Sequence, residues 1–201
     1  MPYRRTERLT ARLAEDRELI LAAACDVVRD GGFTTAKMAS VAAAAGVGTG
    51  SLYRHFPSKA ALFSEMLRAV CARELEVVQA VAATGGPAAE RLGDAAELFA
   101  LRALRSHGLA YSVIVEPMDP EVDQVRLDAR RRLADVFSGL VAEGMAAGEL
   151  PDQPAGTAGA ALIGAILEAL VSPLASPETT IPETVARDIR HFCLRSVGAA
   201  G

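Results

Sequence analysis

The stretch from Gly46 to Lys59, GVGTGSLYRHFPSK, combines residue types that bind phosphate groups. Its glycines and small hydroxyl residues let a backbone approach a ligand closely. Its phenol, imidazole and ammonium groups can donate hydrogen bonds to phosphate oxygens. Enzymes use such stretches as loops that hold a nucleotide, and DNA-binding proteins use them to open a short helix that enters a groove. The elements on either side decide between these two chemistries.

The nucleotide-binding interpretation fails on the spacing and on the preceding element. Gly46, Gly48 and Gly50 follow the pattern G-x-G-x-G, whereas a dinucleotide-binding fingerprint reads G-x-G-x-x-G and follows a β-strand. Here the alanine-rich run Ala42–Ala45 precedes the glycines and is expected to be helical. The pattern G-x-x-x-x-G-K-[ST] does not occur in the chain. A nucleotide-binding loop is therefore disfavoured.

Two short helices joined by a glycine predict a helix-turn-helix motif at about residues 37–56. The first helix is expected at residues 37–45 with Thr35 as its cap, and Gly46 supplies the left-handed turn conformation. The second helix is expected at residues 49–56. Small residues at its start allow the backbone close to base edges, where hydroxyl groups can hydrogen-bond. Its outward-facing residues are Thr49, Gly50, Ser51 and Arg54.

Hydrophobic spacing predicts helices along the rest of the chain, and no segment alternates as a strand does. Residues 1–14 are polar and basic, so we expect a flexible basic arm there, with the first helix beginning at Glu15 and ending at Gly31 and Gly32. Ser58 is expected to cap a long helix that ends before Gly85. The fold class is therefore all-α. The remaining expected helices are 88–106, 109–115, 121–147, 155–171 and 184–197.

Composition and charge exclude several classes of protein. Apolar residues make up 51% of the 201 residues, which favours a folded core over disorder. Residues 1–75 hold eleven basic and eight acidic side chains, whereas residues 76–201 hold ten and seventeen. This basic head on an acidic body suggests that the N-terminal part faces a polyanion. The apolar run between Asp152 and Glu168 has fifteen uncharged residues, which is short for a membrane helix.

No motif in the sequence predicts catalysis or a metal site. Neither G-x-S-x-G nor H-E-x-x-H occurs in the chain. The three histidines show no ligand spacing, and the three cysteines form no C-x-x-C pair, which fits a reducing cytoplasm. We therefore expect no enzyme activity, no cofactor, no metal and no membrane, and a cytoplasmic, nucleoid-associated protein.

The segment from Thr34 to Phe63, TTAKMASVAAAAGVGTGSLYRHFPSKAALF, resembles the DNA-binding domain of the TetR/AcrR family of bacterial transcriptional regulators. The features that carry the resemblance are a threonine-capped helix, the motif A-x-x-A-G-V, small polar residues, and then L-Y-x-H-F-x-x-K-x-x-L. The match covers roughly residues 15–70 and is specific. One departure is Ala44-Ala45 before the turn, where relatives often carry a polar residue.

The resemblance implies an N-terminal three-helix helix-turn-helix domain at residues 15–60 and a C-terminal helical effector-binding and dimerisation domain at residues 61–201. It also implies a homodimer, a pseudopalindromic double-stranded operator and a small-molecule effector. A repressor is the leading interpretation, and the alternative is a helical small-molecule binding protein without a specific DNA target. The implied contacts are Tyr53, His55 and Lys59 with phosphates, Thr35 and Lys37 near the DNA backbone, and Thr49, Gly50, Ser51 and Arg54 with bases.

A proline-broken segment predicts a ligand cavity in the C-terminal part. Pro117 and Pro120 prevent a continuous helix, and such a discontinuity leaves room between helices, where ligand sites commonly form. We expect a small apolar effector inside residues 88–141. For each residue, ordinary core packing stays an equally open alternative. The expected walls are Phe99, Tyr111, Met118 and Phe137, and the expected polar contacts are Arg102, His107 and Glu116.

The run 155–171 predicts the dimer interface, because it is apolar on too many sides for one chain to cover. Two copies of this helix and of the helix 184–197 would form an isologous four-helix contact. Glu168 can pair across that contact, line a pocket or reach solvent, and the sequence leaves these three open. The expected interface residues are Gly156, Ala160, Gly164, Leu167, Glu168, Val171, Ile189 and Phe192.

Overall fold

The computed structural model describes residues 3–199, with side chains described from residue 13 onward. Within this range every regular element is a helix, which confirms the expected all-α fold. The elements are α1 (Tyr3–Thr35), α2 (Met38–Ala44), α3 (Thr49–His55), α4 (Lys59–Ala82), α5 (Ala88–Arg105), α6 (His107–Ile114), α7 (Pro120–Ala146), α8 (Ala155–Ala175), the 3-10 turn η1 (Pro177–Thr179) and α9 (Pro182–Ser196).

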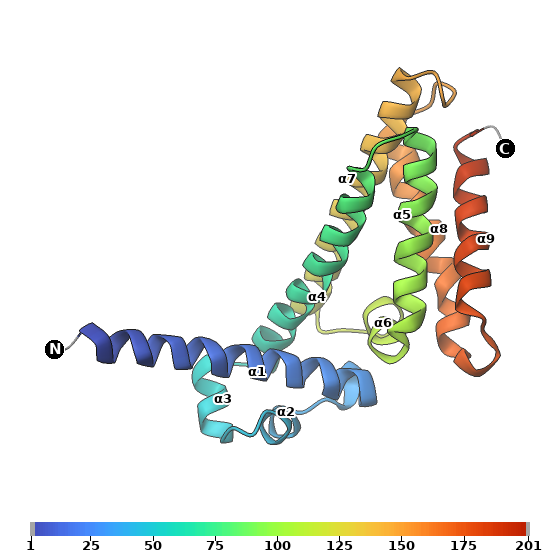
Figure 1. The fold of residues 1–201 in the computed structure, drawn as a ribbon. Helices are drawn as coiled ribbons and strands as arrows, with labels where there is room; N and C mark the ends of the chain where they lie inside the picture. The colour runs from blue at the N-terminus through green and yellow to red at the C-terminus, as the bar shows by residue number, and fades with distance from the viewer. Residues whose placement is uncertain (1–2, 200–201) are drawn as a thin grey trace.

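The first three helices and the start of α4 form a small N-terminal unit around one apolar cluster. Ile20, Val41 and Leu52 are fully buried in it, together with Phe56 and Phe63. Helices α2 and α3 lie below α1, at the end of the molecule that points away from the other helices (Figure 1). This position leaves one side of the unit free for a large partner.

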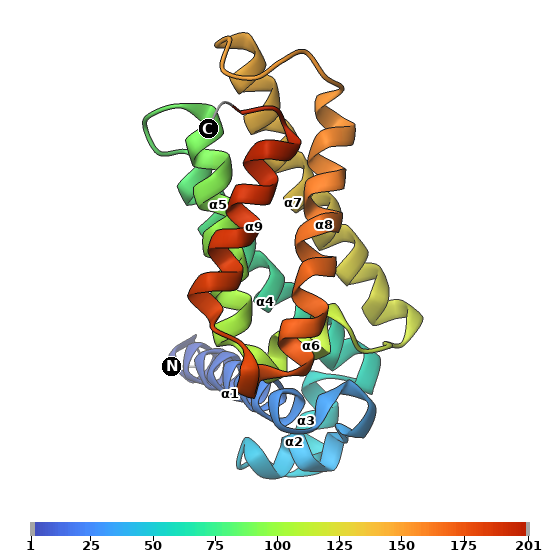
Figure 2. The same ribbon diagram turned by 90° about the vertical axis from the view of Figure 1, so that its right-hand side faces the viewer.

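Helices α4 to α9 form the body around a second apolar cluster, in which Leu92, Phe137 and Leu170 are fully buried. The helix pairs with the most extensive contacts are α7 with α8, α5 with α9, and α4 with α7. Helix α4 runs from the N-terminal unit into the body and so joins the two clusters. Helices α8 and α9 lie side by side on one outer face (Figure 2).

The beginning of the chain differs from the sequence prediction. Helix α1 begins at Tyr3 rather than Glu15, so residues 3–14 continue the first helix instead of forming a separate arm. Leucine, arginine and glutamate are good helix formers, and they sustain this helix without a regular apolar face. The side chains of the arm's arginines lie outside the described residues, as do residues 1–2 entirely.

The connection between α1 and α2 also differs in its capping. Gly32 has φ 74° and breaks the helix as expected, but one more helical turn follows it. The hydroxyl of Thr35 donates a hydrogen bond back to the carbonyl of Gly31, so Thr35 does not cap α2. Lys37 occupies the position before α2, and its side chain makes no capping hydrogen bond. By contrast, Ser58 caps α4 as predicted, because its Oγ accepts a hydrogen bond from the Ala61 N–H at 3.0 Å.

Helix α8 is long and apolar enough to cross a membrane by length and composition. About 39% of its most apolar window is buried against the other helices. Core helices of globular proteins meet the same criterion, and Glu168 lies exposed within this helix. The expectation of no membrane contact therefore stays an expectation.

Candidate DNA-binding surface and internal cavity

The turn between α2 and α3 has the geometry that the sequence predicts. Gly46 has φ 68°, a left-handed conformation that glycine adopts without steric cost. The N–H of Val47 donates to the carbonyl of Ala42 at 3.0 Å, which satisfies the end of α2. Buried Ala42 and fully buried Leu52 pack the two helices together. The chain thus places two short helices across a tight turn, as a helix-turn-helix motif requires.

Most of the predicted DNA contacts lie on the free surface of this motif. Thr49, Gly50 and Arg54 are exposed on α3, and Ser51 is half-buried. A Cβ on Gly50 would meet no atom within 4 Å, so the space beside the first turn of α3 is open. Tyr53 is 49% exposed, which favours a surface role over a core role. Thr35 and Lys37 are exposed before α2.

Two predicted phosphate contacts have additional roles inside the chain. The Lys59 ammonium donates to the carbonyl of Phe33 at 3.0 Å and lies 5.6 Å from the centre of the Phe63 ring. The Nε2 atom of His55 is buried without a hydrogen-bond partner among the described residues. Lys59 therefore braces α1 against α4, and His55 cannot reach a phosphate through Nε2 in this conformation.

An ion pair that the sequence did not predict fixes α1 to the motif. Arg17 Nε donates to Glu65 Oε1 of α4 at 2.8 Å, and its guanidinium lies 4.5 Å from the centre of the Phe56 ring. The same guanidinium donates to the carbonyl of His55 at 3.3 Å, at the end of α3. One arginine thus holds α3 and α4 against α1, so the orientation of α3 depends on it.

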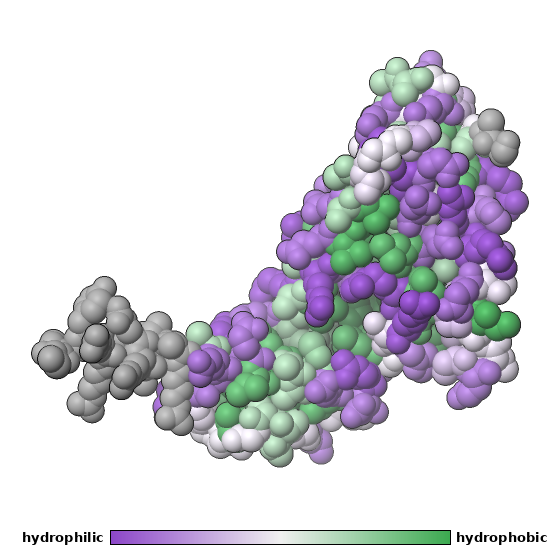
Figure 3. Space-filling view, viewed as in Figure 1, coloured by the Kyte–Doolittle hydropathy of each residue, from purple (hydrophilic) through white to green (hydrophobic). Residues whose placement is uncertain are grey.

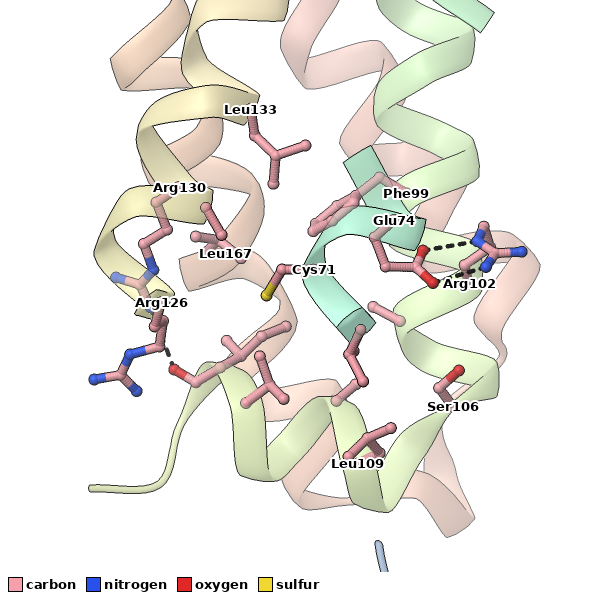
Figure 4. Close-up of a pocket in the computed structure, with 16 residues that line it drawn as sticks. Cys71, Glu74, Phe99, Arg102, Ser106, Leu109, Arg126, Arg130, Leu133 and Leu167 are labelled. Atoms are coloured by element: carbon pink, nitrogen blue, oxygen red, sulfur yellow. Dashed lines mark hydrogen bonds and ion pairs between the residues drawn. The ribbon is translucent and has the colours of Figure 1, made fainter. Parts of the chain in front are cut away.

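The body contains a cavity of about 120 Å³ between α4, α5, α6, α7 and α8. Its wall is mostly apolar, with Phe99, Leu109 and Leu133 among the larger side chains (Figure 4). Apolar residues also reach the surface between α4 and α5 (Figure 3). The C-terminal part therefore contains a cavity, as expected. Its volume suits a small apolar molecule.

On the α4–α5 side of the cavity, Glu74 and Arg102 neutralise each other. Arg102 Nε and one terminal nitrogen each donate to a Glu74 oxygen at 2.7 Å. These hydrogen bonds raise the pKa of Arg102 above its ordinary value. Cys71 lies between this pair and the opposite wall, and burial raises its pKa to about 11, with a smaller contribution from Glu74. The thiol is therefore protonated at neutral pH.

On the opposite wall, α7 contributes Arg126 and Arg130, one helical turn apart. Arg126 forms an ion pair with Asp123 and donates to the carbonyl of Glu116 at 3.1 Å. Arg130 donates weakly, at 3.4 Å, to the carbonyl of Ile114. Burial, and then the charge of Arg126, lower the pKa of Arg130, while Asp123 partly opposes this shift.

Of the seven residues predicted for the cavity, Phe99 and Arg102 line it and the other five do not. His107 Nε2 lies 2.8 Å from the carbonyl of Leu174, where it joins α6 to α8. Phe137 is fully buried in the body core, and Tyr111 packs against the same core. Met118 packs instead against the N-terminal cluster. Tyr111 and Phe137 serve packing because α6 and α7 turn these positions toward the core, whereas Met118 lies in the connection between the two helices.

Glu116, the fifth of these residues, contacts the N-terminal unit instead of the cavity. Its carboxylate accepts a hydrogen bond from the N–H of Phe33 at 2.8 Å. A Cβ on Gly32 would collide with this carboxylate, so the close contact requires glycine there. Glu116 therefore ties the α6–α7 connection to the segment that leads into α2. Through its carbonyl it also contacts Arg126 of the cavity wall.

Helix α6 lies directly on α1. A Cβ on Gly108 would collide with the carbonyl of Arg29, so α6 approaches the α1 backbone as closely as glycine permits. Ser112 is buried, and its hydroxyl lies 3.4 Å from the carbonyl of Val28. Since α6 also forms one wall of the cavity, the cavity and the DNA-binding unit share this element.

The sequence reasoning missed the charged residues of the cavity. Arg130, Arg131 and Arg132 form one basic run in the sequence, but Arg130 lines the cavity and is half-buried, whereas its two neighbours are exposed. The i, i+4 spacing of Arg126 and Arg130 was the available signal, because residues four apart share one face of a helix. Glu74 and Arg102 lie on different helices, and no spacing connects them.

The outer face of α8 and α9 carries only part of the predicted dimer interface. Gly156, Ala160, Gly164 and Glu168 are exposed on α8, and Phe192 is 48% exposed on α9. A Cβ on Gly156 or Gly164 would meet no atom within 4 Å. Val171 is half-buried. Leu167 and Ile189 are buried in the body core of the single chain, so they offer little surface to a partner.

Comparison with known families identifies the N-terminal unit. Residues 20–66 match the family described as "Bacterial regulatory proteins, tetR family", which confirms the resemblance seen in the sequence. This range contains α2, α3 and the start of α4. No curated protein sequence matches the chain significantly.

Solved structures share the whole fold at low sequence identity. The regulator FadR from Bacillus subtilis, solved in complex with stearoyl-CoA, is 18% identical with a TM-score of 0.80, over 92% of this chain and 99% of that one. FadR from Bacillus halodurans, a fatty acid degradation regulator, is 17% identical with a TM-score of 0.78, over 88% and 97%. NalD from Pseudomonas aeruginosa, the secondary repressor of an efflux pump, is 22% identical with a TM-score of 0.75, over 92% and 98%. These likenesses extend the shared fold to the body.

Proposed function

We propose that this chain, which belongs to the TetR family of bacterial regulatory proteins, is a ligand-responsive repressor that binds a pseudopalindromic operator as a homodimer. The observation that carries the proposal is the exposed first turn of α3, where Thr49 and Gly50 leave open space beside the backbone. An α-helix enters the major groove of B-DNA, and small residues at its start bring it close to base edges.

In this proposal α3 reads the bases and its surroundings hold the phosphates. Thr49, Gly50, Ser51 and Arg54 face base edges. Tyr53, with its exposed ring, and the residues before α2, Thr35 and Lys37, contact the DNA backbone. Lys59 donates one of its three N–H groups to Phe33, which leaves two for a phosphate.

The dimer in this proposal forms through the outer face of α8 and α9, as the small exposed residues of α8 favour. Ala160 and Gly164 would let two copies of α8 approach closely, and Phe192 of α9 would become buried. Two α3 helices would then meet successive major grooves, about 34–36 Å apart.

The effector in this proposal binds in the cavity between α4 and α8 and acts on the DNA-binding unit through Glu116. The wall residue Arg126 contacts the carbonyl of Glu116, whose carboxylate holds the N–H of Phe33 just before α2. A ligand that moves Arg126 therefore acts on a chain of contacts that ends at the helix-turn-helix motif. A thousandfold loss of operator affinity requires about 4 kcal/mol of coupling between the two sites.

The competing candidate is a helical small-molecule binding protein that does not recognise a particular DNA sequence. The cavity favours ligand binding in both cases, so only DNA binding discriminates between them. We would measure gel shifts with genomic fragments, including the promoter region beside the protein's own gene, in the presence of excess random DNA. Selective retention of one fragment supports the regulator. Equal, weak binding to every fragment supports the alternative.

A further inference from the structure

The charges that surround the cavity do not balance. Arg102 is matched by Glu74, and Arg126 is matched by Asp123. Among the side chains that the structure describes, no carboxylate lies within ion-pair distance of Arg130. Glu168 lines an outer groove together with Arg130 but is exposed and forms no ion pair with it. The cavity wall therefore carries one unmatched positive charge.

This charge is costly without a partner. Arg130 is partly buried, and its described hydrogen bond, to the Ile114 carbonyl, is long at 3.4 Å. The neighbouring Arg126 has a second unmet requirement, since its Nε is buried without a hydrogen-bond partner. Both side chains line the cavity from α7, and their guanidinium groups lie at its edge, on the side away from Glu74 and Arg102 (Figure 4). A partly buried cation that lacks a counter-ion favours the binding of an anion.

The other residues of the cavity wall determine the size and polarity of the rest of the ligand. Facing the two arginines are apolar side chains from α5, α6 and α8, and Glu74 opposite is already occupied by Arg102. The volume of about 120 Å³ is comparable to the engineered apolar cavity of about 150 Å³ that holds a benzene molecule. The apolar part of a ligand is therefore small. The residues that contact it are Phe99, Leu109, Val113, Ile114, Leu133 and Leu167.

We propose that the cavity binds a small apolar molecule with one anionic group, which lies against Arg130 and Arg126 while its apolar part lies among the α5, α6 and α8 side chains. This proposal names the chemical class of the molecule that binds in the cavity. It rests on the proposed function only in one respect, that the bound molecule acts as the effector. A carboxylate accepts two hydrogen bonds from an arginine, so it suits this wall better than a neutral or cationic group.

The test compares three molecules with the same phenyl group, benzoate, benzyl alcohol and benzylamine, by calorimetric titration of the full chain without DNA. We expect benzoate to bind at least about tenfold more tightly than benzyl alcohol, since hydrogen bonds to charged groups are the strong ones. Benzylamine is expected to bind weakest. If benzyl alcohol or benzylamine binds as tightly as benzoate, or if benzoate does not bind, the proposal is wrong. This comparison needs no variant.

A matched pair of variants locates the anion. Arg130→Gln removes the unmatched charge, and Arg132→Gln removes the same charge from an exposed position two residues away. Benzoate affinity should fall at least about tenfold in Arg130→Gln and stay unchanged in Arg132→Gln, while benzyl alcohol affinity stays the same in both. Equal benzoate affinity in the two variants would overturn the assignment to Arg130. Operator binding is measured separately without benzoate, so a failure of this test leaves the DNA-binding proposal standing.

Discussion

Replacing Gly50 with alanine separates folding from DNA binding at a single atom. Gly50 is the second residue of α3, and a Cβ there would meet no atom within 4 Å. Glycine inside a helix costs roughly 0.5–1 kcal/mol relative to alanine, and a position in the first turn should give the lower value. Gly50→Ala should therefore stabilise the fold by about 0.5 kcal/mol, which for a chain of this size raises Tm by about 1–2 °C.

The same methyl group should weaken operator binding, because it occupies the space through which α3 approaches the bases. A misfit at one base pair typically costs about 1–3 kcal/mol. A symmetric dimer carries the change in both half-sites, so even about 1 kcal/mol in each gives about 2 kcal/mol in total. That corresponds to a loss of operator affinity of roughly thirtyfold. Stability and function should thus move in opposite directions.

The assay pairs thermal unfolding with fluorescence titration of operator DNA, and two glycines serve as controls. Gly139 is exposed on α7 with open space around it, so Gly139→Ala should raise Tm and leave DNA affinity unchanged. Gly46 has φ 68°, so Gly46→Ala should destabilise the fold by about 1–2 kcal/mol through backbone strain. Unchanged operator affinity in a stabilised Gly50→Ala protein would refute the placement of α3 against the bases.

Four further results are expected. Lys59→Ala should reduce the slope of log affinity against log salt concentration by about 1.8, because a dimer loses two phosphate contacts that contribute about 0.9 each. An unchanged slope would show that Lys59 does not contact DNA. In sedimentation experiments Gly164→Arg should be a folded monomer and Gly139→Arg a dimer; a dimeric Gly164→Arg would place the contact elsewhere. Cys71, with its pKa raised to about 11, should be only about 0.1% thiolate at pH 8 and should therefore react slowly with an alkylating reagent. The alkylation rate should rise with pH through about 11, and fast alkylation at pH 8 would contradict a buried thiol. Glu116→Ala leaves the Phe33 N–H without its acceptor and should lower the free energy of unfolding in urea by about 1–3 kcal/mol; no loss would mean that water replaces the carboxylate.

The helix-turn-helix motif was predictable because its signals are local. A glycine with φ 68°, a serine whose hydroxyl caps α4 and a proline after α3 each act within a few residues of their own position. Thr35 shows the limit of such reasoning, since its hydroxyl bonds back to Gly31 rather than forward to α2. A threonine near a helix boundary can serve either helix, and only the backbone geometry selects one.

The cavity was predictable in its place but not in most of its residues. Pro117 and Pro120 correctly marked a discontinuity between helices, yet the residues around that break mainly serve the core and the contact with α1. The cavity wall comes from five helices that meet only after folding. Which face of α7 turns inward depends on its contacts with α4 and α8, so Arg130 and Arg132 look alike in the sequence and lie in opposite environments.

The most direct test of the central claim is a footprint of the protein on the intergenic DNA beside its own gene. The account predicts one protected pseudopalindromic site, with half-sites a whole number of helical turns apart, and loss of protection in Gly50→Ala under identical conditions. Uniform, salt-sensitive binding without a protected site, on this DNA and on fragments selected from the genome, would contradict a sequence-specific regulator.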